Sequence, residues 1–143
     1  MRFAGIYTPV ITPHHADGSI DRDGFAAMIE YLIASGVHGI INGGSTGEYY
    51  AQSMAERLEM ASLAKDVIGD RVPLMVGTVA IRLEDSIRMA DHAAQIGAAA
   101  ILVGSPPYSV PTERENALNA LAIDRAADLP IILYPAFPKW RVV

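Results

Sequence analysis

Short apolar runs alternate with amphipathic stretches along the whole chain of 143 residues. Five runs have the length of a strand, and the four stretches between them repeat apolar residues with the period of a helix. Successive runs stand roughly 25 to 35 residues apart, which is the span of one strand–helix–strand unit. Nearly continuous apolar strands are expected where both faces of a parallel sheet are covered. The expected strands are residues 6–12, 39–41, 73–77, 98–103 and 130–134.

Helix-capping signals mark where the amphipathic stretches begin. Asp21 is a good N-cap residue, and the pairs Ser53 with Glu56 and Thr112 with Glu115 fit the S/T-x-x-E capping box. Glycines follow the first three stretches and favour helix ends there. The expected helices therefore cover residues 21–35, 53–68, 83–96 and 112–127.

Two architectures accommodate parallel strands that are joined by helices. An open, doubly wound sheet of five strands fits a single domain of 143 residues. A (β/α)8 barrel typically needs ~250 residues, so this chain would form only part of one. The pattern of strands and helices does not separate the two architectures, and length favours the open sheet.

A glycine-rich turn, Gly43–Glu48, follows the second expected strand and precedes a helix. This is the end of a parallel strand at which α/β folds bind their ligands. Glycines let several backbone N–H groups point into one small space, and Ser45 and Thr46 add hydroxyl donors. Such a turn suits a carboxylate or a phosphate. The alternative is a turn in which the glycines serve backbone geometry alone.

The composition argues against several classes of partner. The formal net charge of −5 disfavours nucleic acid, and the absence of cysteine excludes disulfides and thiolate metal sites. The histidines are either adjacent or on separate elements, which is poor spacing for a metal ion. Residues 1–9 hold no apolar segment typical of a signal peptide, and no run approaches the ~20 apolar residues that span a bilayer. We therefore expect a soluble, cytoplasmic protein without metal, membrane or nucleic-acid partner.

Three motifs occur in order, each at the end of an expected strand: Gly43–Glu48, Pro106–Tyr108 and Leu133–Tyr134. Together they closely resemble the dihydrodipicolinate synthase and N-acetylneuraminate lyase family. The resemblance runs from Arg2 to Tyr134 and covers the first half of such a protein. It implies an α/β fold in which this chain forms strands one to five of a parallel (β/α)8 barrel, and so overturns the preference for an open sheet. Residues 1–134 would be this half-barrel.

The resemblance also implies a reaction class. Members of this family are class I aldolase-type lyases, in which a lysine on the sixth strand forms a Schiff base with pyruvate or another 2-oxo acid. The expected partner is thus a small 2-oxo acid, with no cofactor, and the family is homo-oligomeric. The sequence does not choose among an amino-acid precursor, sialic acid and a sugar acid as substrate.

The site residues follow from the same resemblance. The substrate-binding residues would be Gly44, Ser45, Thr46 and Gly47, with the Thr46 hydroxyl and the N–H groups of the turn holding the substrate carboxylate. Tyr134 would be the general acid and base, and Ser45 would relay protons between Tyr134 and Tyr108. In relatives, the equivalent of Tyr108 comes from a neighbouring subunit.

Each side chain also has a simpler interpretation. A tyrosine at a strand end, such as Tyr134, more often packs than catalyses, and Tyr108 beside two prolines would merely close a loop. Arg57 and Arg114 stand among glutamates on expected helices and are most simply solvated.

The chain departs from the family pattern after Tyr134. Relatives usually continue with Asn-x-Pro, whereas residues 135–143 read as a divergent tail. Lys65 and Lys139 are the only lysines, and neither occupies a sixth-strand position. We therefore expect a truncated or frameshifted chain that lacks the imine-forming lysine and is inactive as it stands.

Two alternatives remain open at this point. One is a non-enzymatic half-barrel that binds a 2-oxo acid or another anion. The other is a doubly wound domain of the response-regulator type, which would place acidic residues after the first strand, where this chain has Thr8, Pro9, Thr12 and Pro13.

Overall fold

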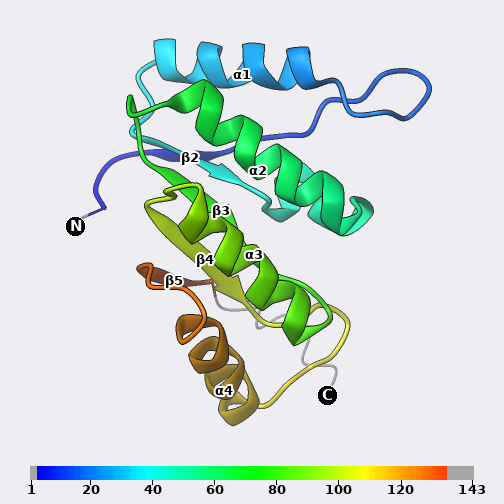
Figure 1. Cartoon of the computed structure of the whole chain (residues 1–143), viewed down its shortest axis with the longest axis vertical. Helices are drawn as coiled ribbons and strands as arrows, with labels where there is room; N and C mark the ends of the chain where they lie inside the picture. Colours follow the sequence, from blue (N-terminus) through cyan, green and yellow to red (C-terminus); the bar gives the residue numbers. More distant parts are fainter. Residues whose placement is uncertain (1–2, 135–143) are drawn as a thin grey trace.

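Five parallel strands form one sheet in the order of the sequence, β1-β2-β3-β4-β5 (Figure 1). The computed structural model describes residues 3–134. In a doubly wound sheet the strand order reverses at a switch point, and here it does not. The sequential order therefore confirms the barrel-type arrangement and rules out the open doubly wound one. The strands are β1 (Tyr7–Pro9), β2 (Gly39–Asn42), β3 (Leu74–Gly77), β4 (Ala100–Gly104) and β5 (Ile131–Tyr134).

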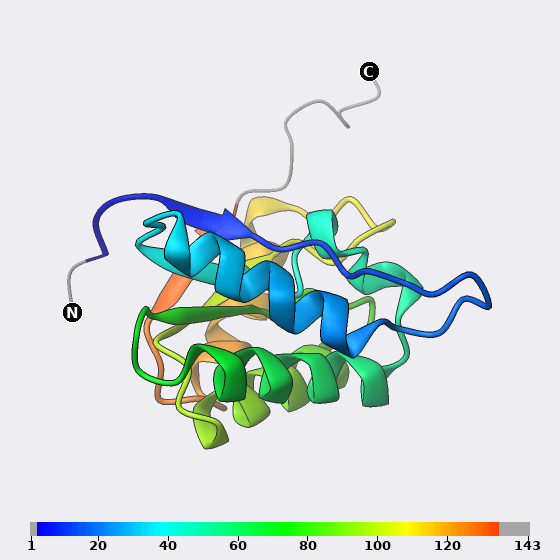
Figure 2. The same cartoon turned by 90° about the horizontal axis from the view of Figure 1, so that it is seen from above.

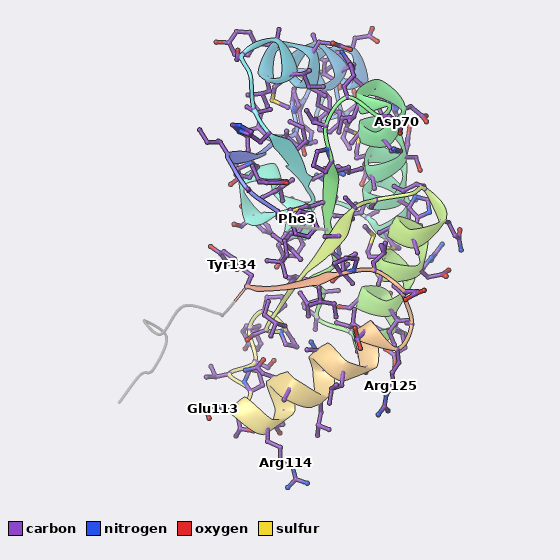
Figure 3. The ribbon with its side chains drawn as sticks, turned by 90° about the vertical axis from the view of Figure 1, so that its left-hand side faces the viewer. Phe3, Asp70, Glu113, Arg114, Arg125 and Tyr134 are labelled. Atoms are coloured by element: carbon purple, nitrogen blue, oxygen red, sulfur yellow. The ribbon has the colours of Figure 1, made fainter. Side chains whose placement is uncertain are left out.

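Four helices connect the strands and lie along one face of the curved sheet (Figure 3). Three of the N-caps are the residues that the sequence indicated: Asp21 accepts a hydrogen bond from the Gly24 N–H, and both capping boxes form. The third helix begins after Arg82, which makes no side-chain cap bond. The helices are α1 (Arg22–Ala34), α2 (Met54–Ile68), α3 (Leu83–Gln95) and α4 (Glu113–Asp124).

The core lies between the sheet and these helices. Leu74 and Val76 of β3, with Ile101 and Val103 of β4, all belong to it. Alternate residues, such as Met75, face the opposite side. Within residues 3–134 no helix covers that opposite side, which is the arrangement expected for part of a (β/α)8 barrel. An apolar strand pattern does not say whether its second face meets a helix or the interior of a barrel.

The first strand is shorter than the sequence indicated. It was expected over residues 6–12 but ends at Pro9, and the Val10 N–H makes one further bond, 3.0 Å long, to the Ile41 carbonyl. The chain then leaves the sheet in a long loop that projects beside α1 (Figure 2). The loop folds back on itself through an antiparallel bridge between His14 and Ile20. Residues that look like a strand in the sequence thus form the base of this loop.

The two edge strands differ from the centre of the sheet. Every residue of β3 is buried, whereas in β5 Leu133 is 65% exposed and Tyr134 is 52% exposed. Backbone groups at the edges of an open sheet are available to a further strand.

In the described part of the chain, no helix is long and apolar enough to cross a membrane.

Candidate functional site

The glycine turn begins with a close approach between the ends of β2 and β3. Gly43 has a φ of +77°, a conformation that favours glycine. A Cβ on Gly77 would stand 2.3 Å from the Gly43 carbonyl oxygen, which no side chain tolerates. Two glycines therefore allow the two strand ends to touch and start the turn.

A hydrogen-bond network fixes the other end of the turn from the side of β1. The Thr12 hydroxyl donates to the Gly47 carbonyl at 2.8 Å, and Gln52 Nε2 donates to the same oxygen at 2.8 Å and to Thr12 Oγ1 at 3.0 Å. Thr12 and Gly47 are buried. Sequence reasoning missed this network, and its one signal was a threonine at the end of an apolar run.

The middle of the turn is open to solvent. Ser45 and Thr46 are exposed, in a single 3-10 turn over Ser45–Gly47. The Gly47 N–H bonds the Gly44 carbonyl and the Glu48 N–H bonds the Ser45 carbonyl. Among the described residues, neither the N–H groups nor the hydroxyls of Ser45 and Thr46 have an acceptor. These donors are therefore available to a ligand at the C-terminal edge of the sheet.

The two tyrosines predicted for the site lie at the same edge of the sheet. Tyr134 is the last residue of β5 and pairs with Gly104 at the end of β4. Figure 3 shows Tyr134 at the end of its strand, away from the helices. Tyr108 is in the loop after β4, fully exposed, with a φ of +72°. In the sheet, β3 and β4 lie between β2, which leads to Ser45, and β5, which ends at Tyr134. The proton relay between Tyr134 and Ser45 stays a prediction.

Arg57 is not solvated, contrary to the sequence-based interpretation. Arg57 is only 6% exposed, because it stands on the face of α2 that also buries Met60 and Ala61. Its Nη2 donates to the Gly77 carbonyl at 3.3 Å, and its guanidinium carbon lies 5.0 Å from the centre of the Tyr49 ring. The sequence did contain a signal for this burial: Arg57 stands three and four residues before the apolar Met60 and Ala61, so it lies on the same face of the helix. Arg114, by contrast, is exposed on α4 as predicted (Figure 3).

Burial shifts the pKa values of this pair in opposite directions. It lowers the pKa of the Arg57 guanidinium and raises the pKa of the Tyr49 phenol, because it disfavours the charged form of each group. The Tyr49 phenol is therefore neutral at pH 7, and its ring faces the cation. With Arg82 and Asp85, the two side chains also line a pocket of about 370 Å³.

Metal ligands do not gather in the described part of the chain. Over residues 3–134, no group of three or more His, Asp or Glu side chains could hold a metal ion. The chemistry that these residues offer is hydrogen bonding to an anion at the turn, with phenols at the same edge of the sheet.

Comparisons with known proteins agree with this geometry. The chain matches the Dihydrodipicolinate synthetase family over residues 2–139. It is 35% identical over 137 residues to the 4-hydroxy-tetrahydrodipicolinate synthase of Chelativorans sp. strain BNC1, covering 96% of this chain and 47% of that protein. The chain spans about half the length of the curated relatives that it matches.

Solved structures give the same picture. A prophage protein of the dihydrodipicolinic acid synthase family from E. coli K12, in complex with pyruvate, superimposes with a TM-score of 0.90 at 36% identity, over 96% of this chain and 46% of that one. N-acetylneuraminate lyase from Mycoplasma synoviae superimposes with a TM-score of 0.88 at 26% identity, over 94% of this chain and 47% of that one.

Proposed function

Because the chain belongs to the Dihydrodipicolinate synthetase family, we propose that it carries the carboxylate-binding part of a site for pyruvate or a related 2-oxo acid. One observation carries the proposal: the donors of Ser45 and Thr46 stand together at the exposed end of β2 with no acceptor among the described residues. A solved relative that is 36% identical to this chain is in complex with pyruvate.

The turn suits a carboxylate better than a neutral group. Two adjacent N–H groups and the Thr46 hydroxyl would donate to the two carboxylate oxygens, and hydrogen bonds to a charged acceptor are about twice as strong as neutral ones. The Thr12–Gln52–Gly47 network and the Gly43–Gly77 contact fix the turn before a ligand arrives. A site organised in advance loses less entropy on binding.

The lyase chemistry belongs to the complete barrel. In the family, a sixth-strand lysine forms the imine, and here Tyr134 would transfer protons at the imine carbon with Ser45 and Tyr108 as relay. A phenol in water has a pKa near ~10, so the hydroxyl chain would have to move the proton at neutral pH. By analogy with relatives, Tyr108 would act on the site of a neighbouring subunit, which suits its exposed position.

For the 143-residue chain itself, we propose binding without imine formation. Lys65 stands on α2, where its Nζ donates to the Gly69 carbonyl at 2.9 Å and to Asp70 at 3.2 Å. It is thus engaged at the C-terminal end of a helix that flanks the sheet. Lys139 lies outside the described residues. The position of Lys65 therefore argues against its being the imine-forming lysine.

Borohydride reduction in the presence of pyruvate, followed by intact mass, tests whether binding is covalent. We expect no adduct, and a stoichiometric adduct on Lys65 or Lys139 would overturn non-covalent binding.

Calorimetry of Thr46→Val tests the site, and we expect affinity for pyruvate about tenfold weaker, as for the loss of one charge-assisted hydrogen bond. Thr8→Val on β1 is the control and should bind normally. Equal affinity of both variants would refute the role of the turn.

A further inference from the structure

The burial of the charged Arg57 side chain costs free energy at this position. Its side chain is nine-tenths buried, its Nε has no hydrogen-bond partner among the described residues, and its one hydrogen bond, to the Gly77 carbonyl, is 3.3 Å long. Burying a cation costs free energy unless other groups compensate it. The face of the Tyr49 ring and the charge of Asp85 compensate it in part. A side chain that only filled space here would be apolar, as Met60 one turn later is.

The two groups that Arg57 contacts stand at the two ends of the glycine turn. Gly77 ends β3, and its backbone packs against Gly43, where the turn begins. Tyr49 starts a second 3-10 turn directly after Glu48, whose left-handed backbone, with a φ of +54°, closes the first one. Arg57 therefore connects the beginning of the turn to its end through Gly77 and Tyr49.

We infer that Arg57 is a positioning residue: it braces the turn through Gly77 and Tyr49 so that the Ser45 and Thr46 donors converge on one carboxylate. The inference rests on the proposed function for the identity of the ligand. Arg57 does not touch the substrate. Its planar guanidinium lies against an aromatic ring while it donates to a carbonyl, which the compact ammonium of lysine reproduces poorly.

The bracing is separate from the network on the other side of the turn. Thr12 and Gln52 hold the Gly47 carbonyl from the side of β1, whereas Arg57 acts from α2 and β3. In a variant without Arg57, the Gly47 carbonyl still accepts hydrogen bonds from Thr12 and Gln52. Tyr49 and the end of β3, however, are no longer connected through the guanidinium. The turn should then remain folded and become less ordered at Ser45 and Thr46.

The test compares Arg57→Met, which keeps the apolar packing, with Arg57→Lys, which keeps the charge. Each purified 143-residue variant is titrated with pyruvate, unfolded in urea, and examined by amide NMR without ligand. We expect Arg57→Met to bind pyruvate about tenfold more weakly, with amide changes centred on residues 44–48, and Arg57→Lys to restore little of the affinity. Wild-type affinity and an unchanged turn spectrum in Arg57→Met would overturn the inference.

Substitutions at Tyr49 keep the inference testable if Arg57 variants do not fold. Tyr49→Phe keeps the ring face and should bind pyruvate normally, whereas Tyr49→Ala should lose affinity as Arg57→Met does. Equal binding by these two variants would contradict the bracing role. Absence of pyruvate binding by the wild-type chain would instead refute the proposed function, and the ligand-free turn spectra would still decide whether Arg57 braces the turn.

Discussion

The turn after β2 and the loop after β4 occupy equivalent places but are built differently. Each follows a strand of the sheet, and each leads into a helix with a capping box. The turn after β2 is fixed from three other segments, through Thr12, Gly77 and Arg57. The loop after β4 is held by local contacts: Ser109 donates to the Pro106 carbonyl at 3.5 Å, Asn116 donates to the Pro111 carbonyl at 3.4 Å, and Thr112 forms the capping box with Glu115.

The difference is sharpest at Tyr108. Its ring is fully exposed, yet its backbone has a φ of +72°, which costs a non-glycine residue about 1 kcal/mol. Such strain usually persists where surrounding structure requires it. The turn after β2 is thus complete within this part of the chain, whereas the loop after β4 has a shape that its own contacts do not explain.

The largest expected effect is steric and falls at the start of the first turn. Gly77→Ala places a Cβ 2.3 Å from the Gly43 carbonyl oxygen, so the two strand ends must separate. We expect the free energy of unfolding in urea to fall by about 3 kcal/mol. Gly44→Ala is the matched control, because its φ is −82° and no atom lies within 4 Å of the new Cβ. Equal losses for the two variants would show that the contact between β2 and β3 is not the constraint.

A smaller effect of opposite sign is expected in the second loop. Tyr108→Gly removes an exposed side chain and relieves a left-handed backbone, so the free energy of unfolding should rise by about 0.5–1 kcal/mol. Tyr50, which is 69% exposed and has an ordinary negative φ, gives the control: Tyr50→Gly should lower stability. A loss of stability in Tyr108→Gly would mean that the loop is held by contacts of its own.

The smallest effect concerns the two capping boxes and depends on pH. Hydrogen bonds from Ser53 lower the pKa of Glu56, and those from Thr112 lower the pKa of Glu115. A carboxylate with a lowered folded pKa stabilises the protein above its unfolded pKa, near ~4.3, and loses this contribution as pH falls through the folded pKa. Stability of the wild-type chain should therefore decrease below about pH 4.3 more than that of Glu56→Gln or Glu115→Gln. Parallel pH profiles for the wild type and both variants would contradict the assignment.

Local signals in the sequence predicted much of this fold. Asp21, Ser53 and Thr112 cap helices as expected, because a cap depends on residues three or four positions away. The sequential strand order required the family resemblance, since an open sheet and a barrel share one alternating pattern.

The supports of the turn could not be predicted in the same way. Thr12 and Gly47 are 35 residues apart in the sequence, and Arg57 and Gly77 are 20 apart, so nothing local connects them. Arg57 was misassigned because its charged neighbours suggested a solvated face, while tertiary packing of α2 buried it. The exposed donors of Ser45 and Thr46 were found because glycine-rich turns at strand ends have a recognisable sequence. The residues that hold the turn have none.

The most direct test of the account follows amide resonances of the ¹⁵N-labelled chain during a titration with pyruvate. We predict that the amides of Ser45 and Thr46 shift together with a single dissociation constant, and that acetone, which has the ketone but lacks the carboxylate, leaves them unchanged. Shifts confined to the loop around Tyr108, or equal shifts with acetone, would contradict the claim that the turn after β2 is a carboxylate site.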